Sequence, residues 1–134
     1  MNETIQYYSR NATNRGVLKW DDILVHWEEN RNCGEDVTVY IKIKDNIFED
    51  FRFDGDLSII TTACSAVFWE FIIGQPIETV FDMWYSDIVE MIESEVSPRR
   101  RRASVFALLA TRNAIHKYLL DGKHDDFWDV WVEN

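Results

Sequence analysis

Two segments in the first half of the chain alternate between apolar and polar residues. The first spans residues 37–43 and places four apolar side chains on one face, those of Val37, Val39, Ile41 and Ile43. The second spans residues 47–53, where the same spacing puts Ile47, Glu49, Phe51 and Phe53 on one face. A period of two is typical of a half-buried strand, and the polar turn KDN between the segments predicts a hairpin. A third strand is predicted over residues 23–29, with Leu24, His26 and Glu28 on one face.

From residue 57 onward, helical patterns replace this alternation. Residues 57–73 are apolar almost all the way round, which predicts a buried helix that Gly74 ends. Residues 77–93 read as one broken helix or two short ones after Pro76, and a long helix follows Ser97-Pro98. A short amphipathic helix over residues 3–12 precedes the strands. This order predicts the α+β class, with a three-stranded antiparallel sheet and helices packed on one face.

Length and composition narrow the class of protein. The chain has 134 residues, 46% of them apolar, which is enough for one globular domain over residues 1–134. No apolar run reaches the roughly 18–20 residues of a membrane span, and the N-terminus lacks a signal-peptide pattern, so we expect a cytoplasmic protein. The net charge of −10 argues against nucleic acid as a partner. Two cysteines in a reducing compartment argue against a disulfide framework.

The C-terminal tail, residues 122–134, is acidic and contains Phe127, Trp128 and Trp131. One interpretation is a short helix that docks these aromatic side chains on the body of the domain. The other is a tail that binds a partner.

Motifs of common enzyme classes are absent from the sequence, including phosphate-binding glycine loops and the H-E-x-x-H zinc motif. The three histidines are scattered along the chain. A nucleophile pair of Cys33 and His26 has no support from the flanking residues. We therefore expect a protein without enzymatic turnover of its own.

Several motifs in their order resemble the IscU/NifU-type iron–sulfur cluster assembly scaffolds. They are IQYYSRNATNRGVL, NRNCGEDVTVYIKI, IFEDFRFDG, AVFWEFIIGQPIE, SDIVEMIESEVSPRRRRASV and NAIHKYLLDG. The resemblance covers roughly residues 4–121 and implies an IscU/SufE-like fold. The spacing between Gly74 and Ala103 is similar to that of the shorter IscU-type members.

The resemblance also implies a ligand set for zinc or a nascent iron–sulfur cluster, made of three cysteines, an aspartate and often a histidine. Soft thiolates suit such centres, and four ligands close a tetrahedral site. The matching positions in this chain are Cys33, Glu35, Ser58, Arg102 and Ala103. The standard site is therefore incomplete, and the candidate metal ligands are Cys33, Glu35 and Ser58.

Cys64 is a poor substitute for the missing second cysteine. It lies six residues beyond Ser58, on a different face of the predicted helix and about 9 Å along its axis. We interpret Cys64 as a small core residue.

Arg99, Arg100, Arg101 and Arg102 form a run at the predicted start of the long helix. One interpretation is a solvated helix start, offset by nearby glutamates. The others are a docking patch for an acidic partner and a substitute for the charge of the missing metal. The segment VSPRR stands where the family's chaperone-docking motif would lie, so recognition by the usual co-chaperone is not expected.

The leading hypothesis is a divergent scaffold-like or sulfur-accepting protein of iron–sulfur cluster assembly. Cys33 would accept sulfur from a cysteine desulfurase by thiol exchange, which requires an exposed, partly ionised thiol. The alternative is an interaction module that keeps the fold without metal or sulfur chemistry. A third hypothesis is a homodimer in which two Cys33 thiolates share a cluster. The sequence is also compatible with a monomer.

Overall fold

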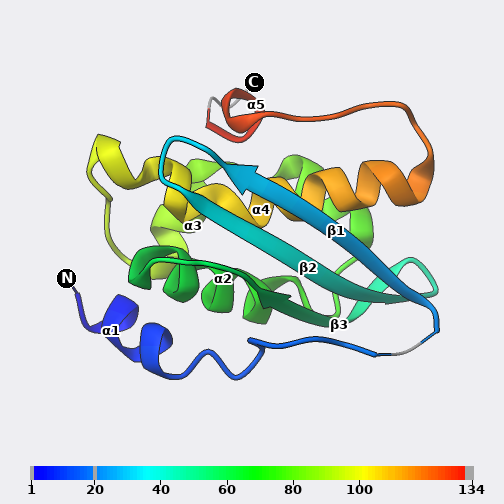
Figure 1. Cartoon of the computed structure of the whole chain (residues 1–134), viewed down its shortest axis with the longest axis horizontal. Helices are drawn as coiled ribbons and strands as arrows, with labels where there is room; N and C mark the ends of the chain where they lie inside the picture. The colour runs from blue at the N-terminus through cyan, green and yellow to red at the C-terminus, as the bar shows by residue number, and fades with distance from the viewer. Residues whose placement is uncertain (1, 20, 132–134) are drawn as a thin grey trace.

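The computed structural model describes residues 2–19 and 21–131. Its elements, in order, are α1 (Glu3–Arg10), β1 (Ile23–Asn30), β2 (Glu35–Lys44), β3 (Ile47–Asp54), α2 (Ile59–Ile72), the 3₁₀ helix η1 (Ile77–Asp82), α3 (Tyr85–Ile92), the 3₁₀ turn η2 (Pro98–Arg100), α4 (Arg101–Leu119) and α5 (Phe127–Trp131). The strands form one antiparallel sheet in the order β1-β2-β3, and Figure 1 shows α2 and α4 on one of its faces. The predicted α+β architecture is confirmed.

Strand β2 is the centre of the sheet and contributes alternate side chains to the core. Val37, Val39 and Ile41 are fully buried, as the alternation predicts. The turn to β3 contains two residues, Asp45 and Asn46, rather than the three predicted. Both have positive φ angles, 53° and 60°, which match the twist of paired strands in a tight hairpin.

The face predicted for β3 is wrong at its first two positions. Phe48 is fully buried, whereas Glu49 is exposed and Ile47 is only half-buried. The cause is a shift in register between Lys42 and Ile43, which leaves an extra residue in β3. Such a bulge reverses the alternation on one side of it, so a strict period of two fails there.

Helices α2 and α4 form the layer behind the sheet. Every residue from Ile60 to Phe68 in α2 is buried, as is every residue from Ala103 to His116 in α4. Both helices are covered on several sides by the sheet and by neighbouring helices, which explains their weak amphipathic pattern. Within the described residues, no helix is long and apolar enough to span a membrane.

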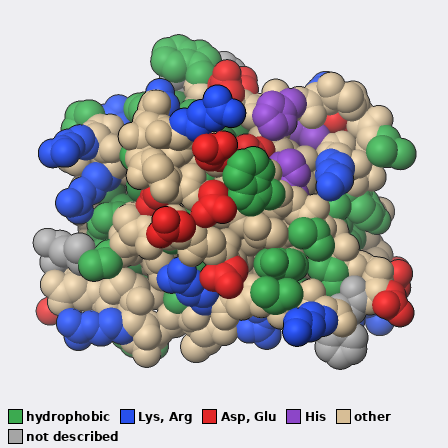
Figure 2. All heavy atoms as spheres, in the orientation of Figure 1, with side chains coloured by type: hydrophobic (Ala, Val, Ile, Leu, Met, Phe, Trp, Pro, Cys, Tyr) green, Lys and Arg blue, Asp and Glu red, His purple; other side chains and the backbone are tan. Residues whose placement is uncertain are grey.

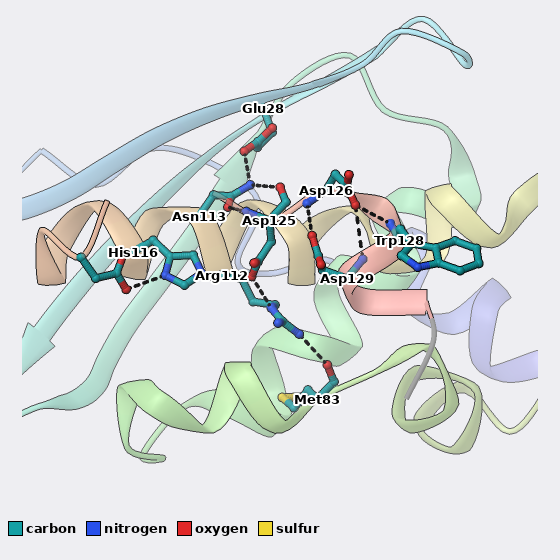
Figure 3. A network of polar contacts seen from close by, with 10 residues as sticks. Glu28, Met83, Arg112, Asn113, His116, Asp125, Asp126, Trp128 and Asp129 are labelled. Atoms are coloured by element: carbon teal, nitrogen blue, oxygen red, sulfur yellow. Dashed lines mark hydrogen bonds and ion pairs between the residues drawn. The ribbon is translucent and has the colours of Figure 1, made fainter. Parts of the chain in front are cut away.

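A polar network holds the segment after α4 against that helix (Figure 3). The Arg112 Nε atom donates to Asp125 Oδ2 at 2.8 Å, and the Asp125 backbone N–H donates to Asn113 Oδ1 at 2.7 Å. The two ring nitrogens of His116 lie 2.7 Å from Asp121 Oδ2 and 3.0 Å from Asp125 Oδ2. These contacts fix the path of the chain into α5.

Helix α5 docks through part of its surface only. Val130 is fully buried, and the Phe127 ring lies 6.0 Å from that of Phe106 between centroids. Trp128 is 69% exposed. The prediction that all three aromatic side chains of the tail dock on the body of the domain is therefore wrong for Trp128. Binding of a partner by the tail stays a prediction.

Candidate functional site

Three segments that are distant in the sequence line an open cavity of about 340 Å³. They are the turn between β1 and β2, the start of α2, and η2 with the first turn of α4. The lining residues are Cys33, Glu35, Ser58, Ile59, Ile60, Arg99, Arg100 and Ala103. The three residues that the sequence nominated as metal ligands are thus brought together, and two of the four arginines lie beside them.

Cys33 is held in a tight turn beyond the last residue pair of β1 and β2. That pair joins Asn30 to Glu35, and the Cys33 backbone N–H donates to the Asn30 carbonyl at 3.2 Å. Gly34 follows with a φ of 66°, a left-handed conformation that glycine adopts without strain. The Cys33 side chain is exposed. The turn therefore presents a thiol to solvent at the mouth of the cavity.

Glu35 lines the same cavity and is only 6% exposed. Its Oε1 atom accepts a hydrogen bond from the Ser58 backbone N–H at 2.7 Å, and both carboxylate oxygens lie 2.8 Å from the Thr61 hydroxyl. Ser58 is the N-cap of α2, and its hydroxyl accepts from the Thr61 backbone N–H at 3.2 Å. A carboxylate here satisfies groups that the helix leaves unpaired and faces the positive end of its dipole. Glu35 and Ser58 therefore have a structural role at the start of α2.

The run of four arginines is divided by the transition from η2 to α4. Arg99 and Arg100 are exposed and line the Cys33 cavity. The Arg101 guanidinium lies 5.1 Å from the centre of the Tyr85 ring, and that of Arg102 lies 5.3 Å from the Phe127 ring. Cation–π contacts of this kind occupy the latter two side chains within the fold. The run is therefore not one uniform patch.

Arg102 and Ala103, which the resemblance matched to ligand positions, are separated by the structure. Ala103 lines the Cys33 cavity with its methyl group, whereas Arg102 lines a second cavity beside α5. Arg99 and Arg100 occupy the first cavity instead. The family resemblance alone did not match Arg99 and Arg100 to ligand positions, but the run of four arginines had named both as candidates for a docking patch or for a substitute of the metal's charge.

The donors in the cavity do not fit a closed zinc or cluster site within one chain. They are the Cys33 thiol, the Glu35 carboxylate, which is already hydrogen-bonded, and a hydroxyl that is a weak donor for soft metals. No group of three or more histidine, cysteine or acidic side chains suited to a metal ion exists in the described part of the chain. Two guanidinium groups at the same cavity repel a cation further.

Cys64 is a core residue, as predicted. It is 1% exposed, and burial raises the pKa of its thiol to about 12. Because the thiolate is the reactive form, this residue is inert at neutral pH in the folded protein.

The three histidines, scattered in the sequence, line one cavity of about 370 Å³ between β1 and the end of α4. Figure 2 shows histidine side chains gathered on the face in view, next to lysine or arginine side chains. The Nε2 atom of His26 lies 2.9 Å from Glu28 Oε1. This cavity shares no lining residue with that of Cys33, so a Cys33–His26 nucleophile pair is not formed.

Residues 1–124 match the family described as NifU-like N terminal domain. The match covers most of the sequence, and the chain belongs to this family.

Three relatives have been given functional names. The iron–sulfur cluster assembly scaffold protein IscU of Thermotoga maritima is 34% identical over 81 residues, which cover 60% of this chain and 56% of that protein. The zinc-dependent sulfurtransferase SufU of Bacillus subtilis is 31% identical over 90 residues, covering 66% and 60%. The scaffold protein IscU 1 of Archaeoglobus fulgidus is 30% identical over 105 residues, covering 78% and 68%. The matched segment thus spans less than two thirds of the length of each of the first two relatives.

Solved structures support the fold. A NifU-like nitrogen-fixing protein of Brucella abortus, in its N-terminal part, is similar with a TM-score of 0.70 and 20% identity, covering 91% of this chain and 95% of that one. A protein of Fervidobacterium islandicum, described as an assembly scaffold for the SUF system, has the same TM-score and identity, covering 84% and 93%.

Proposed function

We propose that this chain is a sulfur-accepting protein of iron–sulfur cluster assembly, with Cys33 as the accepting thiol. The observation that carries the proposal is the exposure of this thiol at the mouth of a cavity whose other donors cannot complete a metal site. The family membership and the names of the relatives, a cluster scaffold and a sulfurtransferase, support the same class of role.

The chemistry is a transfer of one sulfane sulfur atom. The Cys33 thiolate attacks the terminal sulfur of a persulfide on a donor cysteine, and the donor S–S bond breaks as the new bond to Cys33 forms. The donor leaves as a thiol, with the proton that the persulfide carried, and no net oxidation occurs. A cysteine desulfurase would be such a donor. The chain would then pass sulfur on without turnover of its own.

Incubation with a cysteine desulfurase and free cysteine, followed by mass spectrometry of intact protein and peptides, tests this function. We expect a gain of one sulfur atom on the peptide that contains Cys33. The Cys33→Ser variant provides the matched control, since Cys64 stays buried. Absence of the gain on the wild-type chain would contradict the proposal.

A separate experiment distinguishes sulfur acceptance by one chain from binding of a cluster between two chains. A homodimer would bring two Cys33 thiolates and two Glu35 carboxylates to one site. Anaerobic reconstitution with iron and sulfide, followed by iron counting, identifies this case, because a single chain should remain colourless.

A second candidate function is an interaction module, and the exposed Trp128 favours it. This side chain lines a cavity of about 370 Å³ together with Arg102, Asp126, Phe127 and Trp131. Aromatic side chains with arginine neighbours are frequent anchors of protein interfaces. If the arginine run and the tail form the working surface, charge reversal of Arg99, Arg100, Arg101 and Arg102 abolishes the cellular role, whereas Cys33→Ser preserves it.

A further inference from the structure

Arg99 and Arg100 place positive charge beside the Cys33 thiol on a chain whose net charge is −10. We propose that this cavity binds a small anionic sulfur compound, one that carries a carboxylate group and a persulfide or disulfide bond. The two guanidinium groups hold the carboxylate, and the S–S bond meets the Cys33 sulfur. This inference rests on the proposed use of Cys33 as the accepting thiol.

The two arginines outnumber the one carboxylate among the residues that line the cavity, so this lining keeps a net positive formal charge. Glu35 is the carboxylate of the lining, and its oxygens accept hydrogen bonds from the Ser58 backbone N–H and the Thr61 hydroxyl. Neither the Arg99 nor the Arg100 side chain has an ion-pair or hydrogen-bond partner among residues 2–19 and 21–131. Both guanidinium groups are therefore available to an incoming anion.

Arg101 and Arg102 differ from Arg99 and Arg100, because their guanidinium groups are engaged within the fold. The guanidinium groups of Arg101 and Arg102 pack over rings of Tyr85, Phe127 and Trp131, at 5.1, 5.3 and 5.9 Å from the ring centres. These two side chains are held within the fold. Only Arg99 and Arg100, of the four, line the Cys33 cavity.

The size and lining of the cavity indicate a small ligand. Its volume of about 340 Å³ is near the lower end of the range for small-molecule sites. Ile59, Ile60 and Ala103 provide apolar surface for a short carbon chain. Guanidinium groups bind carboxylates through paired N–H donors, a geometry that a lysine cannot reproduce. A carboxylate on a short chain with a sulfur atom fits these three features together.

The reaction at this site is thiol exchange and balances without an added oxidant. With a persulfide R–S–SH, the Cys33 thiolate takes the terminal sulfur, the S–S bond of the ligand breaks, and R–S⁻ leaves. With a disulfide R–S–S–R, Cys33 forms a mixed disulfide and R–S⁻ leaves. In both cases the leaving thiolate departs from a cavity whose positive charge stabilises it.

Rates of Cys33 modification by two aromatic disulfides test the inference without any sulfur donor. One reagent is the dianionic dithiobis(nitrobenzoate), and the other is the neutral dithiodipyridine. The measured quantity is the ratio of the two second-order rate constants. We expect R99Q/R100Q to lower this ratio about tenfold, because local charge raises the encounter rate of an anion. The variant R101Q/R102Q removes the same net charge and should leave the ratio within about twofold of the wild type.

Controls separate a charge effect from a loss of fold. The rate with the neutral reagent should be similar in all three proteins, and a second reactive thiol would report unfolding around Cys64. Should R99Q/R100Q fail to fold, the wild-type salt dependence carries the test, since the ratio should fall as salt screens the arginines. An equal ratio in both double variants, or a ratio insensitive to salt, would overturn the inference. Neither result depends on sulfur transfer from a desulfurase, so failure of the proposed function remains distinguishable.

Discussion

The Glu35 carboxylate accepts a hydrogen bond from the Ser58 backbone N–H at 2.7 Å and so joins the start of β2 to the start of α2. This contact explains why an acidic side chain is buried in the lining of the cavity. It also means that two of the three nominated metal ligands already stabilise a helix terminus. Cys33 remains as the exposed thiol of the site.

Replacement of Glu35 by alanine should destabilise the fold. The Ser58 N–H would lose its acceptor and the buried Thr61 hydroxyl would lose one of its two partners, at a cost of about 1–3 kcal/mol in the free energy of unfolding. Urea denaturation measures this cost. Glu29→Ala is the control, because Glu29 lies on the exposed face of β1 and its ion pair with Arg31 should contribute at most about 1 kcal/mol. Equal stability of Glu35→Ala and the wild type would contradict the structural role of Glu35.

The two cysteines should differ sharply in reactivity. Iodoacetamide at neutral pH is expected to modify Cys33 and leave Cys64 intact, because Cys64 is buried and its thiol pKa is raised to about 12 by that burial. Peptide mass spectrometry measures the labelling of each residue. In denaturant both should react. Similar labelling of the two in the native protein would show that the core around α2 is open.

Asp121 should make stability depend on pH. The hydrogen bond from His116 is the main reason that the pKa of Asp121 lies below its ordinary value of 3.8 in the folded protein. Its stabilisation is therefore present above that ordinary value and is lost as pH falls through the lower, folded pKa. Asp121→Asn should lower Tm near pH 6, with a difference that vanishes in strong acid, where both side chains are neutral.

Thermal unfolding across about pH 2 to 6 measures this difference. Asp21→Asn removes the same charge from an exposed loop and serves as the control. A Tm difference that stays constant across the range would show that the His116–Asp121 contact does not act through charge.

Substitutions on the buried and the exposed face of helix α5 should differ in their effect on the stability of the fold. Val130→Ala removes fully buried methyl groups and should cost about 1–2 kcal/mol in the free energy of unfolding. Trp128→Ala should change stability by less than about 0.5 kcal/mol, because its ring is mostly exposed. Chemical denaturation of both variants compares the two. A larger loss at Trp128 than at Val130 would reverse the docking described for α5.

Local patterns predicted the sheet well where pairing is regular. The alternation of Val37, Val39 and Ile41 reports burial directly, since one face of β2 packs against the helices. The same rule failed at Phe48, because a bulge inserts a residue and a period of two cannot encode it. The bulge depends on how β2 and β3 pair, which is a property of two strands together.

The candidate site was only partly accessible to sequence reasoning. The family resemblance nominated Cys33, Glu35 and Ser58, and the cavity contains all three. It could not distinguish Arg99 and Arg100 from Arg102, because the direction of each side chain depends on where the 3₁₀ turn passes into α4. The sequence likewise did not predict that the three histidines line one cavity, since this follows from the packing of β1 against α4.

Native mass spectrometry of the protein purified from its own host distinguishes sulfur acceptance at Cys33 from metal binding, because one spectrum reports both bound metal and added sulfur. We expect a metal-free chain that carries one additional sulfur atom on Cys33 after exposure to a cysteine desulfurase and cysteine, and none in Cys33→Ser. A wild-type chain that holds a zinc ion or an iron–sulfur cluster near one per subunit, and gains no sulfur, would contradict this expectation.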